Sequence, residues 1–570
     1  MNRFKSFFSS QKTIFWYTVA ILTLPCVMMV FTEVGATLTH LLRVALPLAL
    51  YWLVMTLFKK PGKGFWWTFL FSFFAAFQIV LLYLFGESPV AVDMFLNVVT
   101  TNPTEVDELL SQIYPSVIFV FVVYGLGIGL SVVSLRSREV LAATWRRTQR
   151  RIAACLLGGA LLLLGACYLT DRNFSLRDDI FPFNVAYNFG LSFDRLNKSA
   201  NYQKNVAGFS HHATSSRPAG QAEIYVLIIG ETIRADNMSL YGYGHPTTPT
   251  LDSLEAAGQL AVYRDALTAS NTTHKSVPAL LTPVLSQHDF NAVYRQRGLI
   301  SAFNEAGFST VFYSNQRRNH SLIDFLGCEA REITFTKDSI PITANVFDEK
   351  LVDLLAQRIA HRDSTERMLV VLHTYGAHFD YRDRVPDGFG NNPKPFYPSA
   401  TPPYREQLTQ AYDNAVQYTD FVIGQVIGLI RKTGLPAVVA YTSDHGEDIY
   451  DDNRQRFLHA SPIPTYYQLR VPLLFWASAQ WTEKYPARWQ AILSHRSHAV
   501  STNAVLFHTM LDMAGIRTDH MRIDYALTDT RFTPARRLYI NDHNELLPLD
   551  SCGLKQIDID LFHRNNIKFP

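Results

Sequence analysis

The first third of the chain carries long apolar runs, whereas the remainder alternates shorter apolar runs with helix-like segments. A helix of about 20 apolar residues spans the roughly 30 Å hydrocarbon core of a bilayer. Five runs reach this length, and no small-residue cleavage site of a signal peptide follows the first of them. We therefore expect five membrane-spanning helices, at residues 14–33, 37–58, 65–86, 116–134 and 152–169.

Lysine and arginine residues lie in every second connection of these predicted spans, and therefore on one side of the membrane. Positive residues near the ends of membrane helices are held in the cytoplasm. The N-terminal segment is basic, as are the connections KKPGKG and RSREVLAATWRRTQRR, while the two intervening loops contain no Lys or Arg. The pattern predicts a multi-pass protein of a bacterial inner membrane, with everything after residue 170 in the periplasm.

From residue 221 onward, apolar runs rich in strand-forming residues alternate with helical patterns. The runs are EIYVLIIG, GFSTVFYS, RMLVVLHT and LPAVVAYTS, with VPLLFWA and RRLYIN as further strand candidates. Continuous apolar strands separated by helices indicate a mostly parallel sheet sandwiched by helices. We divide the chain into a transmembrane domain at 1–170, a membrane-surface linker at 171–220 and a periplasmic α/β domain at 221–570.

Composition and charge support this division and exclude one class of partner. With 48% hydrophobic and 18% charged residues, the chain is too apolar for an ordinary soluble domain and too polar for a purely integral membrane protein. The formal net charge is only +3 and no long basic block occurs, so we expect no nucleic-acid partner. The exported part holds only Cys328 and Cys552, which permits at most one disulfide.

Acidic, amide and histidine side chains follow four of the predicted strands. Ligands gather at the carboxyl ends of parallel strands, and Asp, Glu and His are ligands of zinc or manganese. One such residue alone is as often a helix cap or a surface residue, but the whole set is hard to explain in that way. His373 still lies within its apolar run, so we expect it to pack beneath the site rather than to ligate. The set comprises Glu231, Asn315, His373, His378, Asp444, His445, Glu447 and His459.

The hydroxyl-rich segment ALTASNTTHKSVPALLTP, at residues 266–283, supplies a candidate nucleophile. Thr272 and Thr273 precede a helix-like run, where a threonine often does no more than cap the helix. The same position favours a phosphate, because the N–H groups at a helix start bind anions. Coordination to a metal would also lower the pKa of the hydroxyl. At this point both roles, helix cap and nucleophile, are open for each of the two threonines.

The segments IGETIRADNMSLYGY, HTYGAHFDYRDRVP, TSDHGE and LHASPIPTYYQLRVPLLFW follow five spans in that order. This ordered set resembles the bacterial phosphoethanolamine transferases of the alkaline phosphatase and sulfatase superfamily, over the whole chain. The resemblance implies one or two zinc ions, or manganese, held by Glu231, Asp444, His445 and a threonine that is also the nucleophile. It further implies catalytic roles for His378 and His459, and substrate contacts or supporting roles for Thr272, Asn315 and Glu447.

The implied reaction moves phosphoethanolamine from phosphatidylethanolamine to lipopolysaccharide, at a lipid A phosphate or a core sugar, through a covalent phosphothreonine-type ester. Aligning the flanking LT pieces favours Thr273 as the nucleophile, whereas aligning SVP leaves Thr272 as the alternative. Many members that modify lipid A surround the threonine with cysteines, which this chain lacks, so a core sugar or another acceptor stays open.

Three other functions compete with this interpretation. A sulfatase would need a Cys or Ser in a C/S-x-P-x-R pattern, and KSVPALL lacks the arginine. A phosphoglycerol transferase differs only in the lipid headgroup and stays as the alternative enzyme. A transporter or receptor would use the outer domain only for binding, but the spans carry few polar groups for a transport path.

The charge pattern leads to a prediction about topology. Residues 1–12, 59–64 and 135–151 should be cytoplasmic and residues 171–570 periplasmic, because Lys and Arg are retained on the cytoplasmic side. Reporter fusions after residue 61 should be active only with a cytoplasmic reporter, and fusions after residue 200 only with a periplasmic one. The opposite pattern would contradict the five-span arrangement.

Overall fold

The computed structural model describes most of the chain and divides it into two compact units. The first comprises Met1–Leu96 and Leu109–Asp194, and the second comprises Asn97–Glu108 and Arg195–Pro570. The basic residues Arg3 and Lys5, and the predicted span ends at 33 and 86, lie outside the described residues. The described residues are 10–32, 37–85, 91–100, 103–171, 174–218, 220–341, 344–390, 401–402 and 404–569.

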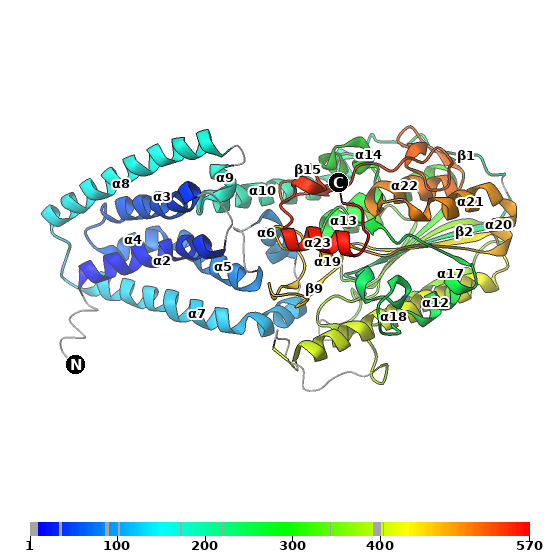
Figure 1. Cartoon of the computed structure of the whole chain (residues 1–570), viewed down its shortest axis with the longest axis horizontal. Helices are drawn as coiled ribbons and strands as arrows, with labels where there is room; N and C mark the ends of the chain where they lie inside the picture. The colour runs from blue at the N-terminus through cyan, green and yellow to red at the C-terminus, as the bar shows by residue number, and fades with distance from the viewer. Residues whose placement is uncertain are drawn as a thin grey trace. The chain divides into compact units, whose positions relative to one another are not determined.

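Apolar helices dominate the first unit (Figure 1). Within the part of the chain that the structure describes, four helices are long and apolar enough to cross a membrane, and a fifth span results if a bent pair of helices counts as one. The five predicted spans therefore correspond to helices of the structure. The long helices are α2 (Gln11–Thr32), α3 (Thr37–Met55), α7 (Pro103–Arg136) and α8 (Ala143–Thr170), the bent pair is α4 (Pro61–Trp67) and α5 (Phe69–Phe85), and α6 (Val92–Thr100) is shorter.

The third predicted span is bent rather than continuous. α4 and α5 meet at 68°, with Thr68 between them. The Thr68 hydroxyl donates a hydrogen bond to the Gly64 carbonyl at 3.0 Å, which is the local side-chain bond that often bends helices. The second half of the basic segment before the fifth span is helical rather than a loop, because α8 begins at Ala143.

The exposed surface of these helices is apolar. Among the described residues, every exposed large hydrophobic side chain lies between Trp16 and Phe193, and examples such as Phe121 and Leu162 are 78% and 79% exposed. Soluble monomers rarely expose contiguous apolar surface on this scale, whereas lipid-facing helices do. The exposure pattern therefore supports a membrane location for this unit.

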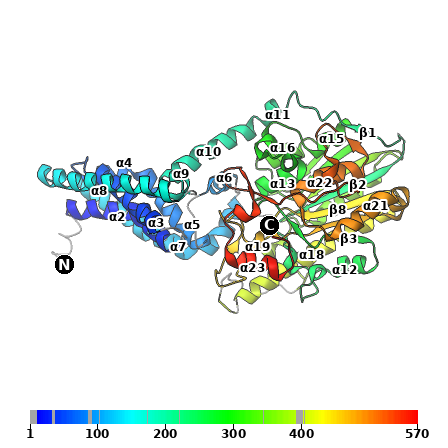
Figure 2. The same cartoon turned by 45° about the horizontal axis from the view of Figure 1, so that its top comes forward.

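A seven-stranded sheet forms the centre of the second unit (Figure 2). Its order is β3-β11-β8-β2-β7-β5-β6, in which β8, β2, β7, β5 and β6 are parallel and β11 is antiparallel to both neighbours. The mostly parallel sheet that the sequence predicts is confirmed. The strands are β2 (Glu223–Gly230), β3 (Leu260–Val262), β5 (Ser309–Ser314), β6 (Glu332–Phe335), β7 (Arg367–His373), β8 (Ala437–Ser443) and β11 (Leu473–Ala477).

Helices cover both faces of this sheet, because its strands are apolar on both sides. Alternate residues of β2 enter two different cores: Tyr225, Leu227 and Ile229 join one, while Ile224 and Val226 join the other. Figure 1 shows the two helical layers on either side of the sheet. One layer includes α13 (Thr273–Leu281), α15 (Leu299–Glu305), α20 (Ala479–Lys484), α21 (Pro486–Ser494) and α22 (Thr502–Met513); the other includes α12 (Pro249–Ala256), α17 (Glu349–Ala360) and α18 (Tyr404–Lys432).

Several elements differ from the sequence expectation or add to it. The candidate strand RRLYIN forms β14 (Leu538–Ile540), which pairs with β15 (Leu546–Pro548) in a separate ribbon and not in the main sheet. The edge strands β3 and β6 have only three and four residues, too few to show a periodic pattern. Cys328 and Cys552 are both free thiols, so the disulfide that the sequence permits is not formed.

Short elements complete the chain. Residues 171–220, predicted as a linker, contain helices and one short strand, and the boundary between the two units falls within α10. These elements are α9 (Leu176–Asp179), α10 (Phe183–Ala200), α11 (Tyr202–Asn205) and β1 (Thr214–Ser215). Later ones are α14 (Val284–Gln287), α16 (Leu322–Gly327), β4 (Ala266–Leu267), β9 (Asp448–Ile449), β10 (Phe457–Leu458), α19 (Tyr466–Leu469), β12 (Val500–Ser501), β13 (Ile516–Arg517) and α23 (Gln556–Arg564).

The turn after β8 is held tightly against a neighbouring segment, which gives a stability prediction. The Gly446 N–H donates to the Gln468 carbonyl at 2.8 Å, and a Cβ on Gly446 would lie 2.1 Å from the Tyr467 carbonyl oxygen. Gly446→Ala should destabilise the second unit by about 1–3 kcal/mol, as overpacking does. Thermal unfolding of the full-length protein, followed by circular dichroism, should show Tm lower by about 2–10 °C.

The matched control is Gly428→Ala in α18, where a Cβ meets open space. This change should leave Tm unchanged or raise it, because Ala favours a helix over Gly by about 1 kcal/mol. Equal Tm values for Gly446→Ala and the parent protein would contradict the packing described for the turn.

Candidate metal centre and active site

The pairing of β2 with β8 places two acidic residues side by side. Gly230 is opposite Ser443 in the parallel pair, so the residues that follow, Glu231 and Asp444, leave the sheet at the same edge. The Asp444 N–H donates to the Gly230 carbonyl at 3.0 Å. The Thr232 N–H donates to Asp444 Oδ1 at 3.2 Å. Both carboxyl side chains are fully buried.

Thr273 meets this pair from the opposite side, as the first residue of α13. Its hydroxyl donates toward the Glu231 carboxylate at 3.2 and 3.3 Å and lies 3.1 Å from His445 Nε2. Thr272 occupies the N-cap position of α13 without a capping side-chain hydrogen bond, and its hydroxyl lies instead 3.2 Å from Ser270 Oγ. The fold therefore distinguishes the favoured Thr273 from the alternative Thr272, because only the Thr273 hydroxyl contacts Glu231.

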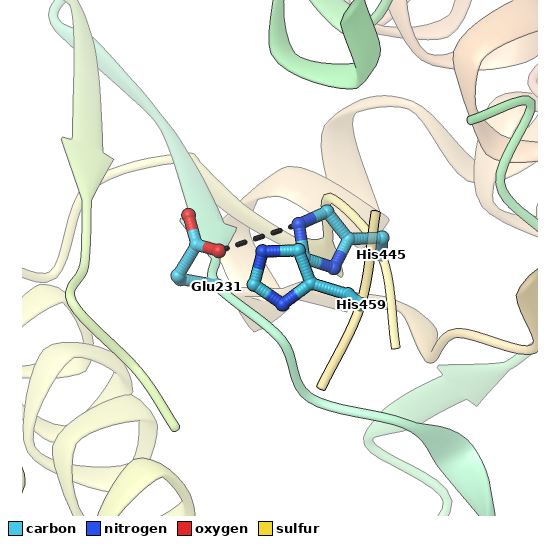
Figure 3. Close-up of side chains that lie close together, drawn as sticks. All are labelled: Glu231, His445 and His459. Atoms are coloured by element: carbon cyan, nitrogen blue, oxygen red, sulfur yellow. Dashed lines mark ion pairs between the residues drawn. The ribbon is translucent and has the colours of Figure 1, made fainter. Parts of the chain in front are cut away.

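Two histidines complete the cluster (Figure 3). His445 Nδ1 lies 2.9 Å from the Gly446 carbonyl, which can only accept, so Nδ1 carries the proton and Nε2 offers a lone pair. That Nε2 lies 3.4 Å from Glu231 Oε1. The rings of His445 and His459 have centroids 4.2 Å apart. One ligand atom each from Glu231, His445 and His459 lie within 4.8 Å of one another.

Glu447 and His378 flank the cluster. Glu447 Oε2 lies 3.3 Å from His459 Nδ1, which fixes the orientation of that ring. The His378 ring lies 5.9 Å from the His459 ring and stacks on Tyr375 at 5.3 Å. Both histidines keep part of their surface exposed, whereas Glu447 is buried. The accessible side of the site is thus lined by His378 and His459.

Burial controls the protonation of these groups. Burial, followed by repulsion from Asp444, raises the pKa of Glu231 well above its ordinary value. Burial also raises the pKa of Asp444. It lowers the pKa of His445 to about 4 and, together with the nearby His274, that of His459 to about 4. Without a cation, the site therefore disfavours negative charge on both carboxylates.

The residues present fit a divalent metal ion. Asp444 Oδ2 and Glu447 Oε1 are buried and have no hydrogen-bond partner among the described residues. Buried oxygens without partners are costly, and a cation beside Asp444 would remove that cost and favour the charged carboxylates. Carboxylate oxygens with a neutral imidazole nitrogen are donors that zinc takes. The Thr273 hydroxyl contacts Glu231 and His445, and His445 Nε2 lies 3.4 Å from Asp444 Oδ2, while the ligand atoms of Glu231, His445 and His459 are close enough to share one ion.

Asn315, one of the predicted residues, lies apart from the cluster, whereas its neighbour Gln316 contacts it. The Asn315 amide donates to the Val346 carbonyl at 2.9 Å and to Asp348 Oδ1 at 2.8 Å, so it supports the loop rather than facing the cluster. Gln316 Nε2 lies 3.2 Å from Glu231 Oε2 and 3.3 Å from His373 Nε2. Gln316 also follows the end of β5, but nothing in the sequence favours this amide over that of Asn315 as the one that contacts the cluster.

The chain is similar to several proteins of known name. Phosphoethanolamine transferase EptA of Salmonella typhimurium is 29% identical over 328 residues, which is 55% of this chain and 56% of that protein. Across the curated relatives in this comparison, the chain spans about half to slightly under two thirds of their length.

Two solved structures share the fold. The integral membrane lipooligosaccharide phosphoethanolamine transferase A from Neisseria meningitidis aligns over 91% of this chain and 98% of that one, with 20% identity and a TM-score of 0.71. The C-terminal periplasmic domain of EcEptC from Escherichia coli, in complex with Zn, covers 60% of this chain and 96% of that one, with 24% identity and a TM-score of 0.53.

The decisive match is to a family profile. The Sulfatase profile covers residues 223–516, from the first residue of β2 through α22, and so includes every residue of the cluster described above. This interval is slightly more than half of the 570 residues. The chain therefore belongs to the Sulfatase family.

Proposed function

We propose that this protein is a metal-dependent phosphoethanolamine transferase of the bacterial inner membrane, with its second unit in the periplasm. The observation that carries the proposal is the contact of the Thr273 hydroxyl with Glu231 and His445 at the start of α13. A hydroxyl in that position suits a nucleophile for a phosphorus centre. We take phosphoethanolamine as the transferred group from the names of the relatives, and a lipooligosaccharide as the class of acceptor from the name of the Neisseria protein.

Zinc is the ion we assign to the site. The E. coli domain with the same fold was obtained as a complex with Zn, and the donor set of this chain suits that ion. Glu231, Thr273, Asp444 and His445 would hold it. When bound, zinc lowers the pKa of a coordinated hydroxyl and offsets negative charge on phosphoryl oxygens. Manganese is the alternative ion, and the number of ions is part of the same proposal.

In the first half of the reaction, Thr273 Oγ1 attacks the phosphorus of phosphatidylethanolamine. A bond forms between Oγ1 and phosphorus, and the bond from phosphorus to the diacylglycerol oxygen breaks. The hydroxyl proton leaves Thr273 and the diacylglycerol oxygen takes up a proton. His459 suits this transfer, because Glu447 orients its Nδ1 and leaves Nε2 available. The product on the protein is a phosphoethanolamine ester of Thr273.

In the second half, an oxygen of the acceptor attacks the same phosphorus, the bond from phosphorus to Thr273 Oγ1 breaks, and the proton that the acceptor oxygen loses is passed on to Oγ1. We propose lipopolysaccharide as the acceptor, modified at a lipid A phosphate or at a core sugar. His378 lies on the accessible side of the site, next to His459, and is placed to take the proton of the incoming oxygen. Both substrates are lipids, and the membrane helices would keep the active site close to the bilayer that contains them.

The supporting residues receive more modest roles. Glu447 orients His459, and Gln316 holds the Glu231 carboxylate from the side of β5. The Thr272 hydroxyl contacts Ser270 Oγ, so Thr272 supports the turn that precedes α13. Asn315 supports the loop that carries Gln316.

The covalent step predicts a modified peptide. Full-length protein incubated with phosphatidylethanolamine, without acceptor, should gain a phosphoethanolamine mass on the peptide that contains Thr273. Thr273→Ala should abolish this mass and lower transfer by at least about 1,000-fold, because the nucleophile is lost. Thr273→Ser should keep some activity. The readout is peptide mass spectrometry with fragmentation.

Thr272→Ala is the matched control. This change removes one neutral side-chain hydrogen bond, to Ser270, which costs about 1 kcal/mol, so the adduct should still form on Thr273. A phosphoethanolamine adduct located on Thr272 would overturn the assignment of Thr273. A glycerophosphate mass on Thr273 after incubation with phosphatidylglycerol, with no adduct from phosphatidylethanolamine, would keep the residue and make the protein a phosphoglycerol transferase. Transfer that survives in the double alanine variant would refute a covalent mechanism.

A further inference from the structure

A second site of distinct chemistry lies near the C-terminal end of the described chain. A cavity of about 570 Å³ opens between the segment that enters β14 and the residues that follow α23. Its size falls within the roughly 300–1,000 Å³ typical of small-molecule sites, and it is larger than a bare inorganic anion needs. Polar residues at its wall include Arg536, Arg537, His563, Asn566 and Lys568.

The polar part of the wall is basic. Arg536, Arg537, His563 and Lys568 line the cavity, and none of its lining residues is acidic. The Arg536 guanidinium is 58% exposed and pairs with Asp550 at 3.0 Å, a surface ion pair of little net stability. Such an arginine can exchange or share its partner with an anionic ligand, and a lysine and a histidine stand nearby.

Arg537 makes the base of the cavity rigid. Its side chain is 5% exposed and binds Asp265. It also donates to the carbonyls of Asp265 at 2.7 Å, Val500 at 3.3 Å and Lys568 at 2.6 Å. One guanidinium therefore joins three segments, while its Nε is buried without a hydrogen-bond partner in the described structure. A wall fixed in this way is preorganised for a ligand.

The apolar part of the wall suits a sugar ring. Ala499, Ile567 and Phe569 contribute aliphatic and aromatic surface beside the cations. Phosphate groups prefer arginine and lysine, and the faces of sugar rings pack on apolar side chains. The combination favours a phosphorylated sugar over an acyl chain, which would find too many charges, and over a free phosphate, which would leave the apolar surface uncovered.

Strand β14 runs from the cavity to the segment that precedes Thr273. Three residues beyond Arg537, the Ile540 N–H donates to the Ala269 carbonyl at 2.7 Å, and Lys275 Nζ donates to the Asn541 carbonyl at 2.8 Å. Ala269 precedes Thr273 by four residues. Even fully extended, these seven residues and the step across the hydrogen bond cover no more than about 30 Å. A glycolipid headgroup of several sugars is long enough to occupy both places.

We propose that this cavity binds a phosphorylated sugar of the acceptor, away from the group that receives phosphoethanolamine. The inference rests on the proposed function for the identity of the acceptor. It makes Arg536 and Lys568 determinants of acceptor affinity, whereas they take no part in the attack of Thr273 on the donor. A second anchor of this kind orients a long glycolipid and selects acceptors that carry more than one anionic group.

Calorimetric titration of the full-length protein in detergent tests this proposal. The probe is the deacylated glucosamine disaccharide with phosphates at positions 1 and 4′, compared with the same disaccharide without phosphates and with inorganic phosphate. The double variant Arg536→Gln, Lys568→Gln should raise the Kd of the bisphosphate about tenfold, the loss of two exposed charge-assisted contacts. The unphosphorylated disaccharide should bind more weakly than the bisphosphate to the parent protein.

The control is Arg531→Gln, Lys432→Gln, which removes the same charge from exposed residues that do not line the cavity. It should leave the Kd of the bisphosphate unchanged. An unchanged Kd in the cavity variant would overturn the proposal, and so would an equal loss in the control variant. Inorganic phosphate that binds as tightly as the bisphosphate would make this a site for the free ion and not for the acceptor.

A parallel measurement separates this proposal from the proposed function. The cavity variant should form the covalent adduct with phosphatidylethanolamine at the parental rate, because that step needs no acceptor. Loss of the adduct in the cavity variant would overturn a role confined to the acceptor. If the parent protein forms no adduct, the proposed transferase function fails, while the calorimetric titration still decides whether the cavity binds a phosphorylated sugar.

Discussion

Two carboxylates buried side by side are the constraint on which the site depends. The parallel register of β2 and β8 brings Glu231 and Asp444 together, and their burial opposes negative charge on both. A structure that places such a pair in a dry position must either keep a proton there or bind a cation. The unpartnered oxygen of Asp444 and the lone pair of His445 Nε2 favour the cation.

The remaining features of the site follow from that pair. α13 starts where its first hydroxyl meets Glu231, so a metal held by the carboxylates would also contact Thr273. Gly446 allows the chain after His445 to pass close to Tyr467, which keeps the turn compact. The loop then returns through β9 and β10 to place His459 over His445, with Glu447 behind it. The proposed ligands, nucleophile and proton carrier thus come from segments that only the sheet brings together.

The sequence predicts those parts that depend on strong local patterns. Glu231, Asp444 and His445 directly follow apolar strands, so the strand-end rule finds them, and the long apolar runs locate the membrane helices. What it misses depends on contacts between distant segments. The hydroxyls of Thr272 and Thr273 point to different partners, which neighbouring positions in a sequence do not reveal. Gln316 is one amide among many, and the Asn315 amide is hydrogen-bonded to Asp348 instead of the cluster. The bend at Thr68 and the separate ribbon of β14 likewise leave no periodic signal.

The metal content of the purified full-length protein tests the central claim most directly. Elemental analysis by mass spectrometry should find at least one zinc ion per chain after dialysis, and Glu231→Gln combined with Asp444→Asn should remove it, because both changes replace a charged ligand. Asp558→Asn, at a buried carboxylate that binds Arg454 outside the cluster, should keep the metal. A parent protein without a stoichiometric divalent ion, or a double variant that retains it, would contradict the account.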